Sequence, residues 1–295
     1  MHSPANVTQT PRDAAPAAVA TAAEDAARAA AGPGVRIDLA GDVPRLERVA
    51  RFLAEVWRTP ESRPPFGVDV LRAIVHAGGA VHCADDGTGL VGASVLTFCA
   101  PGSRAVYSMI AAARTRDRGV GFAVKQAQRA WALQQGATSM LWTFDPLVSR
   151  NARFNLVKLG ATAVAYETDF YGRMDDGIEG DGETDRLTAA WSLAHARTGA
   201  AAAGRPLDSP GPDLAAAEID PRRAPDGEPF VARAADGLWC RVPPDIVALR
   251  REDQPLAVRW RAAVREVLDP AFRAGFVATG FSRDGWYRLT RREQA

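Results

Sequence analysis

An arginine and glycine pattern, Arg116-x-x-Gly119-x-Gly121, stands between an apolar run and an amphipathic helical segment. The first N–H groups of a helix have no internal acceptor, and the helix dipole adds positive potential there. Glycines let the backbone approach an anion closely, and Arg118 adds a second positive charge. A strand, loop and helix in this order predict a phosphate or diphosphate site. The alternative is an ordinary strand-to-helix loop.

The loop differs from two common phosphate-binding motifs. No Gly-Lys-Ser or Gly-Lys-Thr follows it, which excludes a Walker loop. The third glycine of the Rossmann fingerprint is missing, and the loop lies in the middle of a domain rather than after its first strand. The sequence therefore favours another kind of phosphate-binding fold.

Asp145 is the candidate for acid–base chemistry, at the end of a predicted strand over residues 138–144. The proline after it favours an extended conformation, at a point where a cleft should open. We predict that Asp145 is a base for an attacking amine or a ligand for its ammonium group. The alternative is a turn or helix cap. Glu167 and Asp169 alternate on one strand and are interpreted as solvated, and Tyr171 as a packing residue.

These side chains need a scaffold, and the chain has a mixed order of strand and helix patterns. Predicted helices follow Asp42 and cover residues 66–76, 120–135 and 151–159. Predicted strands cover residues 34–40, 80–84, 90–98, 106–113, 138–144, 162–171 and 186–193. Such a series indicates an α/β sheet with helices on its faces.

The chain divides into four parts by composition. Residues 1–33 are rich in Ala and Pro, with almost no large apolar side chains, and are predicted to be a disordered tail. Residues 34–197 carry the α/β pattern, and the Pro-rich residues 198–228 read as a linker. Residues 229–295 are predicted to form a small α+β module that docks on the main domain, because so short a segment makes a marginal core alone.

The charge balance is nearly neutral, with 36 basic and 35 acidic residues, so it gives no footprint for nucleic acid or an anionic membrane. Three separated cysteines fit a reducing cytoplasm better than a disulfide framework. With isolated cysteines and only 4 histidines, we expect no metal site.

Between a fourth strand and a third helix, the Arg-x-x-Gly-x-Gly pattern resembles the acyl-CoA pyrophosphate loop of the GNAT superfamily, over about residues 34–195. A narrower set of motifs resembles one branch of predicted GNAT acyltransferases that carry a C-terminal extension. Those motifs include Trp142-Thr143-Phe144-Asp145-Pro146-Leu147, Lys158-Leu159-Gly160-Ala161 and Val242-Pro243-Pro244-Asp245.

The resemblance implies a GNAT-like mixed central sheet with helices on both faces, plus the small C-terminal module. It implies that the fourth and fifth strands splay apart and that pantetheine lies between them like an extra strand. Asn151 would then bond a pantetheine amide. The residues expected to bind the cofactor are Ala111, Ala113, Arg116, Arg118, Gly119, Val120, Gly121, Phe122 and Asn151.

The function implied is transfer of an acyl group from acetyl-CoA, or from succinyl-CoA, to a small amine or amino acid. For a succinyl group, Arg150 or Arg153 could bind the carboxylate. Many GNAT enzymes have a tyrosine acid where this chain has Leu156, so a non-catalytic CoA-binding or scaffold protein is the alternative. A homodimer is left open.

Overall fold

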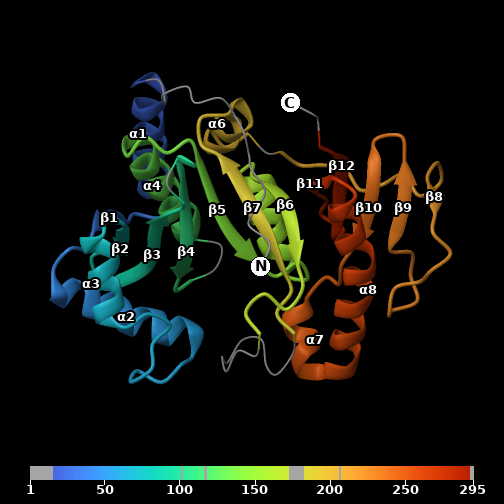
Figure 1. Ribbon diagram of the computed structural model, residues 1–295, viewed down its shortest axis with the longest axis horizontal. Helices are drawn as coiled ribbons and strands as arrows, with labels where there is room; N and C mark the ends of the chain where they lie inside the picture. Colours follow the sequence, from blue (N-terminus) through green and yellow to red (C-terminus); the bar gives the residue numbers. More distant parts are fainter. Residues whose placement is uncertain (1–15, 101, 116–117, 173–182, 206, 293–295) are drawn as a thin grey trace.

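The computed structural model describes residues 16–292, apart from positions 101, 116–117, 173–182 and 206. The strands in that part of the chain are β1 Arg36–Leu39, β2 Ala80–Asp85, β3 Leu90–Phe98, β4 Ala105–Ala113, β5 Ser139–Phe144, β6 Thr162–Glu167, β7 Arg186–Ser192, β8 Glu218–Ile219, β9 Val231–Ala234, β10 Gly237–Arg241, β11 Phe276–Phe281 and β12 Trp286–Arg291. They form one sheet in the order β1-β2-β3-β4-β5-β7-β6-β11-β12-β10-β9-β8. The sheet spans the width of the molecule (Figure 1).

Helices cover both faces of the first half of the sheet, as Figure 1 shows. On one face, α2 (Val43–Trp57) and α3 (Val68–His76) pack against β2 and β3. On the other, α1 (Pro16–Ala31) lies on α4 (Val120–Gln134), which contacts β2, β3 and β4. The mixed α/β class predicted from the sequence is confirmed.

The beginning of α2 follows from its sequence. The Asp42 carboxylate accepts a hydrogen bond from the Arg45 backbone N–H at 2.9 Å, which satisfies one of the free donors of the first turn. Leu46, Val49 and Leu53 then repeat at helical spacing, and all three are fully buried against the sheet.

The N-terminal segment differs from the prediction of a disordered tail, because residues 16–31 form α1 and pack along α4. Alanine favours helix and lets two helix backbones come close, so large apolar side chains are not needed there. Ala22 is fully buried, and Asp25 forms a buried ion pair with Arg129 of α4 at 2.7 Å. Composition alone predicts neither contact. Residues 1–15 lie outside the described part of the chain.

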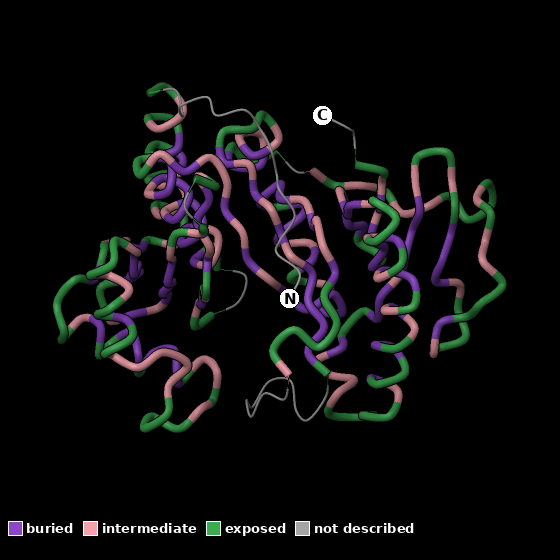
Figure 2. The backbone as a smooth tube through the Cα atoms, in the orientation of Figure 1, coloured by how far each residue is buried: buried purple, intermediate pink, exposed green. Residues whose placement is uncertain are grey.

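Residues 229–292 continue the same sheet. Strand β11 pairs antiparallel with β6 at Ala278 and Ala163. Helix α8 (Gln254–Arg273) follows α7 (Ile246–Glu252) and packs on β6, β10 and β11. In Figure 2, buried stretches of the tube occur both in the central strands and in this segment. The expected linker contains β8 and most of α6 (Ala196–Ala202). The domain boundaries stay a prediction.

Candidate active site

Strands β4 and β5 separate part-way along their length. Their parallel pairs are Ala105 with Ser139, Val106 with Met140, and Tyr107 with Leu141. Beyond these pairs, β4 continues to Ala113 and β5 to Phe144, and their facing edges make no further ladder pairs in the described residues. We call this divergence the fork. Unpaired N–H and C=O groups on two facing edges can accept an extended chain that carries amides.

A bulge in β4 accounts for the fork. On β3, Val95 pairs with Ile110 and the next residue, Leu96, pairs with Ser108, so Met109 is an extra residue without a partner. A bulge bends a strand and increases its twist. The end of β4 therefore turns away from β5, and the expected splay of these two strands is confirmed.

The open end of the fork meets the N-terminus of α4. Gly119 precedes that helix with φ = 82°, a left-handed conformation that favours glycine, and no side chain caps the helix. The Gly119 carbonyl accepts from Ala123 N–H at 2.9 Å. The N–H groups of Val120, Gly121 and Phe122 have no intrahelical acceptor, since they belong to the first turn. This is the geometry of an anion site.

The structure brings most of the predicted cofactor residues to this place. A Cβ added at Gly121 would lie 4.0 Å from the Cβ of Ala113, so the helix start adjoins the end of β4. Ala111 is exposed and pairs with β3 on its other edge. A pocket of about 580 Å³ beside the helix start is lined by residues that include Pro33, Arg114, Arg118 and Val120.

Two other predicted cofactor residues are not part of this described group. Asn151 is exposed in α5 (Ser149–Arg153), which follows β5 and leads into the π-helical turn η1 (Phe154–Lys158). Arg116 lies outside the described residues. The described anion site is therefore built from backbone N–H groups with Arg118 exposed next to them.

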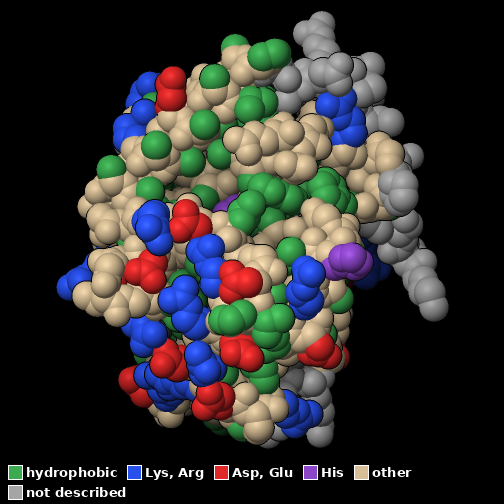
Figure 3. Space-filling view, turned by 90° about the vertical axis from the view of Figure 1, so that its left-hand side faces the viewer, with side chains coloured by type: hydrophobic (Ala, Val, Ile, Leu, Met, Phe, Trp, Pro, Cys, Tyr) green, Lys and Arg blue, Asp and Glu red, His purple; other side chains and the backbone are tan. Residues whose placement is uncertain are grey.

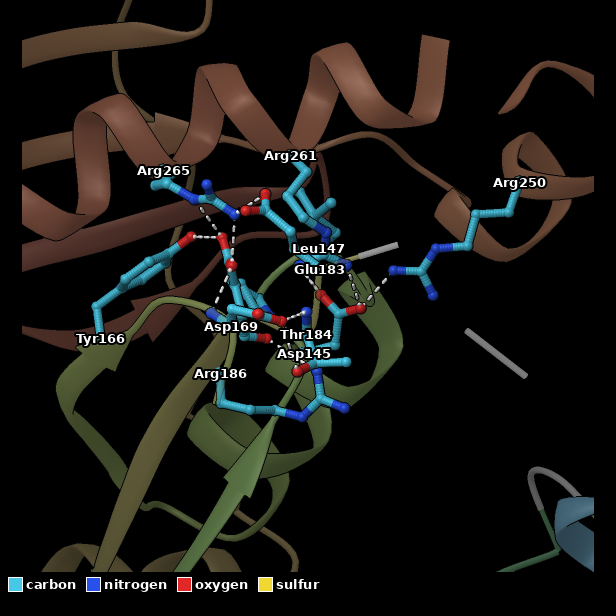
Figure 4. Close-up of polar contacts among 12 residues, drawn as sticks. Asp145, Leu147, Tyr166, Asp169, Glu183, Thr184, Arg186, Arg250, Arg261 and Arg265 are labelled. Carbon is cyan, nitrogen blue, oxygen red and sulfur yellow. Dashed lines mark hydrogen bonds and ion pairs between the residues drawn. The ribbon is translucent and has the colours of Figure 1, made fainter. Parts of the chain in front are cut away.

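Asp145 lies at the end of β5, but its surroundings do not favour the predicted role of a base. Only 4% of it is exposed, and its carboxylate accepts from Arg250 at 2.5 Å and from Arg261 at 3.0 Å (Figure 4). Burial raises the pKa of this carboxyl, but Arg261 and Arg250 lower it more, so the net pKa lies below its ordinary value. A carboxylate held in this way is a weak base, and we assign Asp145 a structural role.

The start of β7 has a similar arrangement in Figure 4. Asp185 is fully buried and accepts from the Arg265 guanidinium of α8 at 2.7 Å and from the Tyr166 hydroxyl. Arg265, Tyr166 and the Asp169 backbone N–H together hold its pKa below the ordinary value in spite of burial. The carboxyl end of β5 and the amino end of β7 are thus fastened to the C-terminal helices by buried ion pairs.

A polar cluster that the sequence did not reveal lies on the face of β5 and β7 opposite α4. Thr143 and Tyr171 share a hydrogen bond of 3.0 Å between their hydroxyl groups, and the Tyr107 hydroxyl of β4 lies close enough for both to influence its pKa. Burial raises the pKa of Tyr107 to about 12, so its hydroxyl stays neutral. Glu167 accepts from Thr188 at 3.2 Å on the same face. We call these five residues the open-face cluster, because the β5 and β7 side chains on this face are half-buried.

This cluster can be found only when the pairing of the strands is known. Tyr107 and Tyr171 are 64 positions apart in sequence, and no short motif links them. Once β4, β5 and β7 are placed side by side, alternation puts Tyr107, Thr143 and Thr188 on one face.

No family model matches the chain, and no curated protein matches it. Several solved structures are similar over part of it. An N-acetyltransferase from Staphylococcus aureus Mu50 is 12% identical with a TM-score of 0.44, covering 54% of this chain and 98% of its own. The ribosomal-protein-S18-alanine N-acetyltransferase from Escherichia coli is 10% identical with a TM-score of 0.44, covering 55% and 96%. The putative acetyltransferase yncA from Salmonella typhimurium, with its cofactor acetyl-CoA, is 16% identical with a TM-score of 0.44, covering 55% and 96%.

Two further findings concern the described residues alone. None of their helices combines the length and the apolar character needed to cross a membrane. They also contain no group of three or more His, Cys, Asp or Glu side chains arranged to hold a metal ion. The face shown in Figure 3 carries basic and acidic side chains interspersed over its lower half.

Proposed function

We propose that this protein is an acyl-CoA-dependent N-acyltransferase of the GNAT type, which moves an acetyl group from acetyl-CoA to a small amine. The observation that carries the proposal is the fork between β4 and β5 with an uncapped helix start at its open end. One place supplies unpaired strand edges for an amide-bearing chain and backbone donors for a diphosphate. CoA has both parts in one molecule.

In this proposal the diphosphate lies on the N–H groups of Val120, Gly121 and Phe122, with Arg116 and Arg118 supplying positive charge. Pantetheine extends along β4 past Ala113 and Ala111. Asn151 bonds a pantetheine amide from the far side of the fork. The thioester then lies near the vertex of the fork, where backbone N–H groups at the bulge can polarise its carbonyl.

The acceptor amine approaches from the face that holds the open-face cluster. Hydroxyl groups of Tyr107, Thr143 and Tyr171 offer hydrogen bonds there, and the exposed Glu167 carboxylate suits an ammonium group. Holding amine and thioester together makes the attack effectively unimolecular, which supplies much of the rate. A base then needs only to remove a proton from the amine.

Two alternatives have their own observations. Leu156 is fully buried in η1 at the position of the GNAT tyrosine acid, which favours a protein that binds CoA without turnover. A succinyl donor needs a cation for its carboxylate. Of the two candidates, Arg153 pairs with Asp208 at 2.5 Å, so a succinyl carboxylate there would compete with that pair. We keep acetyl-CoA as the donor.

The test is calorimetric titration with acetyl-CoA, succinyl-CoA and free CoA, on wild type and Gly121→Glu. Gly121 has room for a side chain, since the nearest atom to an added Cβ is 4.0 Å away, so the variant should fold. A carboxylate at the anion site should weaken CoA binding by about tenfold or more. Gly199→Glu in α6, where an added Cβ meets nothing within 4 Å, is the matched control and should bind like wild type. Absence of binding to wild type would refute the proposal.

A further inference from the structure

Lys125 is a buried amine that the proposed function does not yet use. It lies in the second turn of α4, points into the sheet and is 4% exposed. Its Nζ donates to Ser108 Oγ at 3.0 Å and lies 3.8 Å from the centroid of the Trp142 ring. Gln128 also donates to Ser108 Oγ, at 3.1 Å, so the hydroxyl is fixed from two sides.

The position of this amine relative to the fork is specific. Tyr107 and Leu141 form the last pair of β4 with β5. Ser108 and Trp142 are the next residue of each strand, and both face α4. The Nζ atom therefore lies between the first two side chains past the vertex, on the α4 side of the sheet. A chain bound along the fork would end directly over it.

No carboxylate pairs with Lys125 among the described residues. On the elements packed against α4, Asp25 of α1 is bonded to Arg129 and Arg28, and His82 of β2 faces Ser94 at 3.3 Å. Burial lowers the pKa of Lys125 to about 7 and that of His82 to about 4. An unpaired buried cation is unfavourable. The site therefore favours either a neutral amine or a negative charge that arrives with a ligand.

We propose that Lys125 is a further catalytic residue, which gives a proton to the CoA sulfur as the acyl group leaves it. This inference rests on the proposed function. The acceptor nitrogen forms a bond to the acyl carbon, and the carbon–sulfur bond breaks with its electron pair on sulfur. The Lys125 ammonium protonates that sulfur and becomes a neutral amine. The proton that the new amide nitrogen releases to solvent balances the proton that recharges Lys125.

The environment suits this role better than a purely structural one. A general acid works best when its pKa is near the working pH, and burial moves an ordinary lysine into that range. The Trp142 ring stabilises the charged form without supplying a competing carboxylate. Ser108 holds Nζ in place by a neutral hydrogen bond, so the proton stays available. The acid lies on α4, whereas the usual GNAT position on the next helix holds Leu156.

The test uses free CoA and needs no acceptor. A lysine ammonium next to the bound thiol stabilises its thiolate, so the thiol pKa on wild type should lie at least about one unit below that on Lys125→Met. The thiolate is followed by its ultraviolet absorbance against pH, with the complex of desulfo-CoA subtracted to remove the protein tyrosines. Lys158→Met is the matched control, because it removes the only other lysine, which is exposed.

The outcomes separate the two proposals. If wild type does not bind CoA in calorimetry, the proposed function fails. If CoA binds equally to wild type and Lys125→Met but its thiol pKa is the same on both, the role of Lys125 is refuted. Methionine is apolar and similar in length, so the variant should fold. Ser108→Ala is a second test variant, because it removes the hydroxyl that positions Lys125 Nζ. It should raise the pKa of the bound thiol above the wild-type value, but by less than Lys125→Met does.

Discussion

Asp145 and Lys125 are equally buried, each with 4% of its surface exposed, but they are partnered in different ways. At the end of β5 the Asp145 carboxylate accepts from two guanidiniums and a backbone N–H. Beneath the fork the Lys125 amine has one hydroxyl and one aromatic ring. The Asp145 carboxylate is already paired with two cations, whereas the Lys125 amine could still pair with the negative charge of a ligand.

The difference separates a structural region from a chemical one. A buried charge with a full set of partners is strongly fixed, and its pKa moves away from the range useful for proton transfer at neutral pH. A buried amine without a counter-ion is shifted toward neutrality and responds to any anion that binds beside it. On this reasoning β5 carries both kinds of region, the fork near its middle and the paired carboxylate at its end.

The largest expected effect comes from breaking the paired region. Asp145→Asn leaves two guanidiniums buried without their carboxylate, so the free energy of unfolding should fall by about 3–5 kcal/mol. Chemical denaturation measures the change. Asp208→Asn is the control, because that carboxylate bonds Arg153 and Arg283 near the surface and should cost about 1 kcal/mol or less. If both variants lost the same free energy of unfolding, the buried ion pairs of Asp145 would contribute no more to stability than the surface pairs of Asp208.

The Asp145 contribution also has a defined pH dependence. Because its folded pKa lies below the ordinary 3.8, the carboxylate stabilises the protein fully above that value. The stabilisation is lost as the pH falls through the lowered folded pKa. Acid unfolding of Asp145→Asn should therefore depend less on pH than that of wild type.

The unpaired region should also become more stable as the pH rises, but over a higher pH range. The pKa of Lys125 falls from the ordinary 10.5 to about 7 on folding, so the unfolded chain binds more protons between these values. Stability should then rise with pH over that interval, by up to about 1.4 kcal/mol per unit. Denaturation at several pH values should show this slope in wild type and in Lys158→Met, and not in Lys125→Met. A slope that persists in Lys125→Met would mean that the buried amine is not its source.

The sequence predicted the local features of the site well. The loop at Gly119 and Gly121 could be found because glycine at a helix start is a local signal, and the structure places it there. The hairpin of β11 and β12 can be recognised in the same way, since Asp284-Gly285 between two apolar runs is also a local signal.

The partners of buried charges could not be predicted in this way. Asp145 lies 105 positions from Arg250 and 116 from Arg261, and Lys125 lies 17 from Ser108. Tertiary packing decides whether a carboxylate is free or paired, and the spacing of residues in the sequence does not predict it. The helical N-terminal segment was missed for the same reason, because the partner of Asp25 is Arg129, which lies 104 positions away in the sequence.

The smallest effect on stability is expected in the open-face cluster. Tyr171 is 45% exposed, so Tyr171→Phe should change the free energy of unfolding by about 0.5 kcal/mol or less. Its hydroxyl bonds Thr143 beside the proposed acceptor path, so the KM for an amine should rise several-fold while the KM for acetyl-CoA stays constant. Both are measured by CoA release with a panel of primary amines and amino acids.

Tyr287→Phe is the matched control from the paired region. The Tyr287 hydroxyl is buried and donates to the Pro146 carbonyl at 2.8 Å, so its loss should cost about 1 kcal/mol of stability and leave the acceptor KM unchanged. The two tyrosines thus predict opposite patterns, with one affecting binding and the other stability. If Tyr171→Phe instead raised the KM for acetyl-CoA, the cluster would belong to the cofactor path, and the acceptor would have to approach from another face.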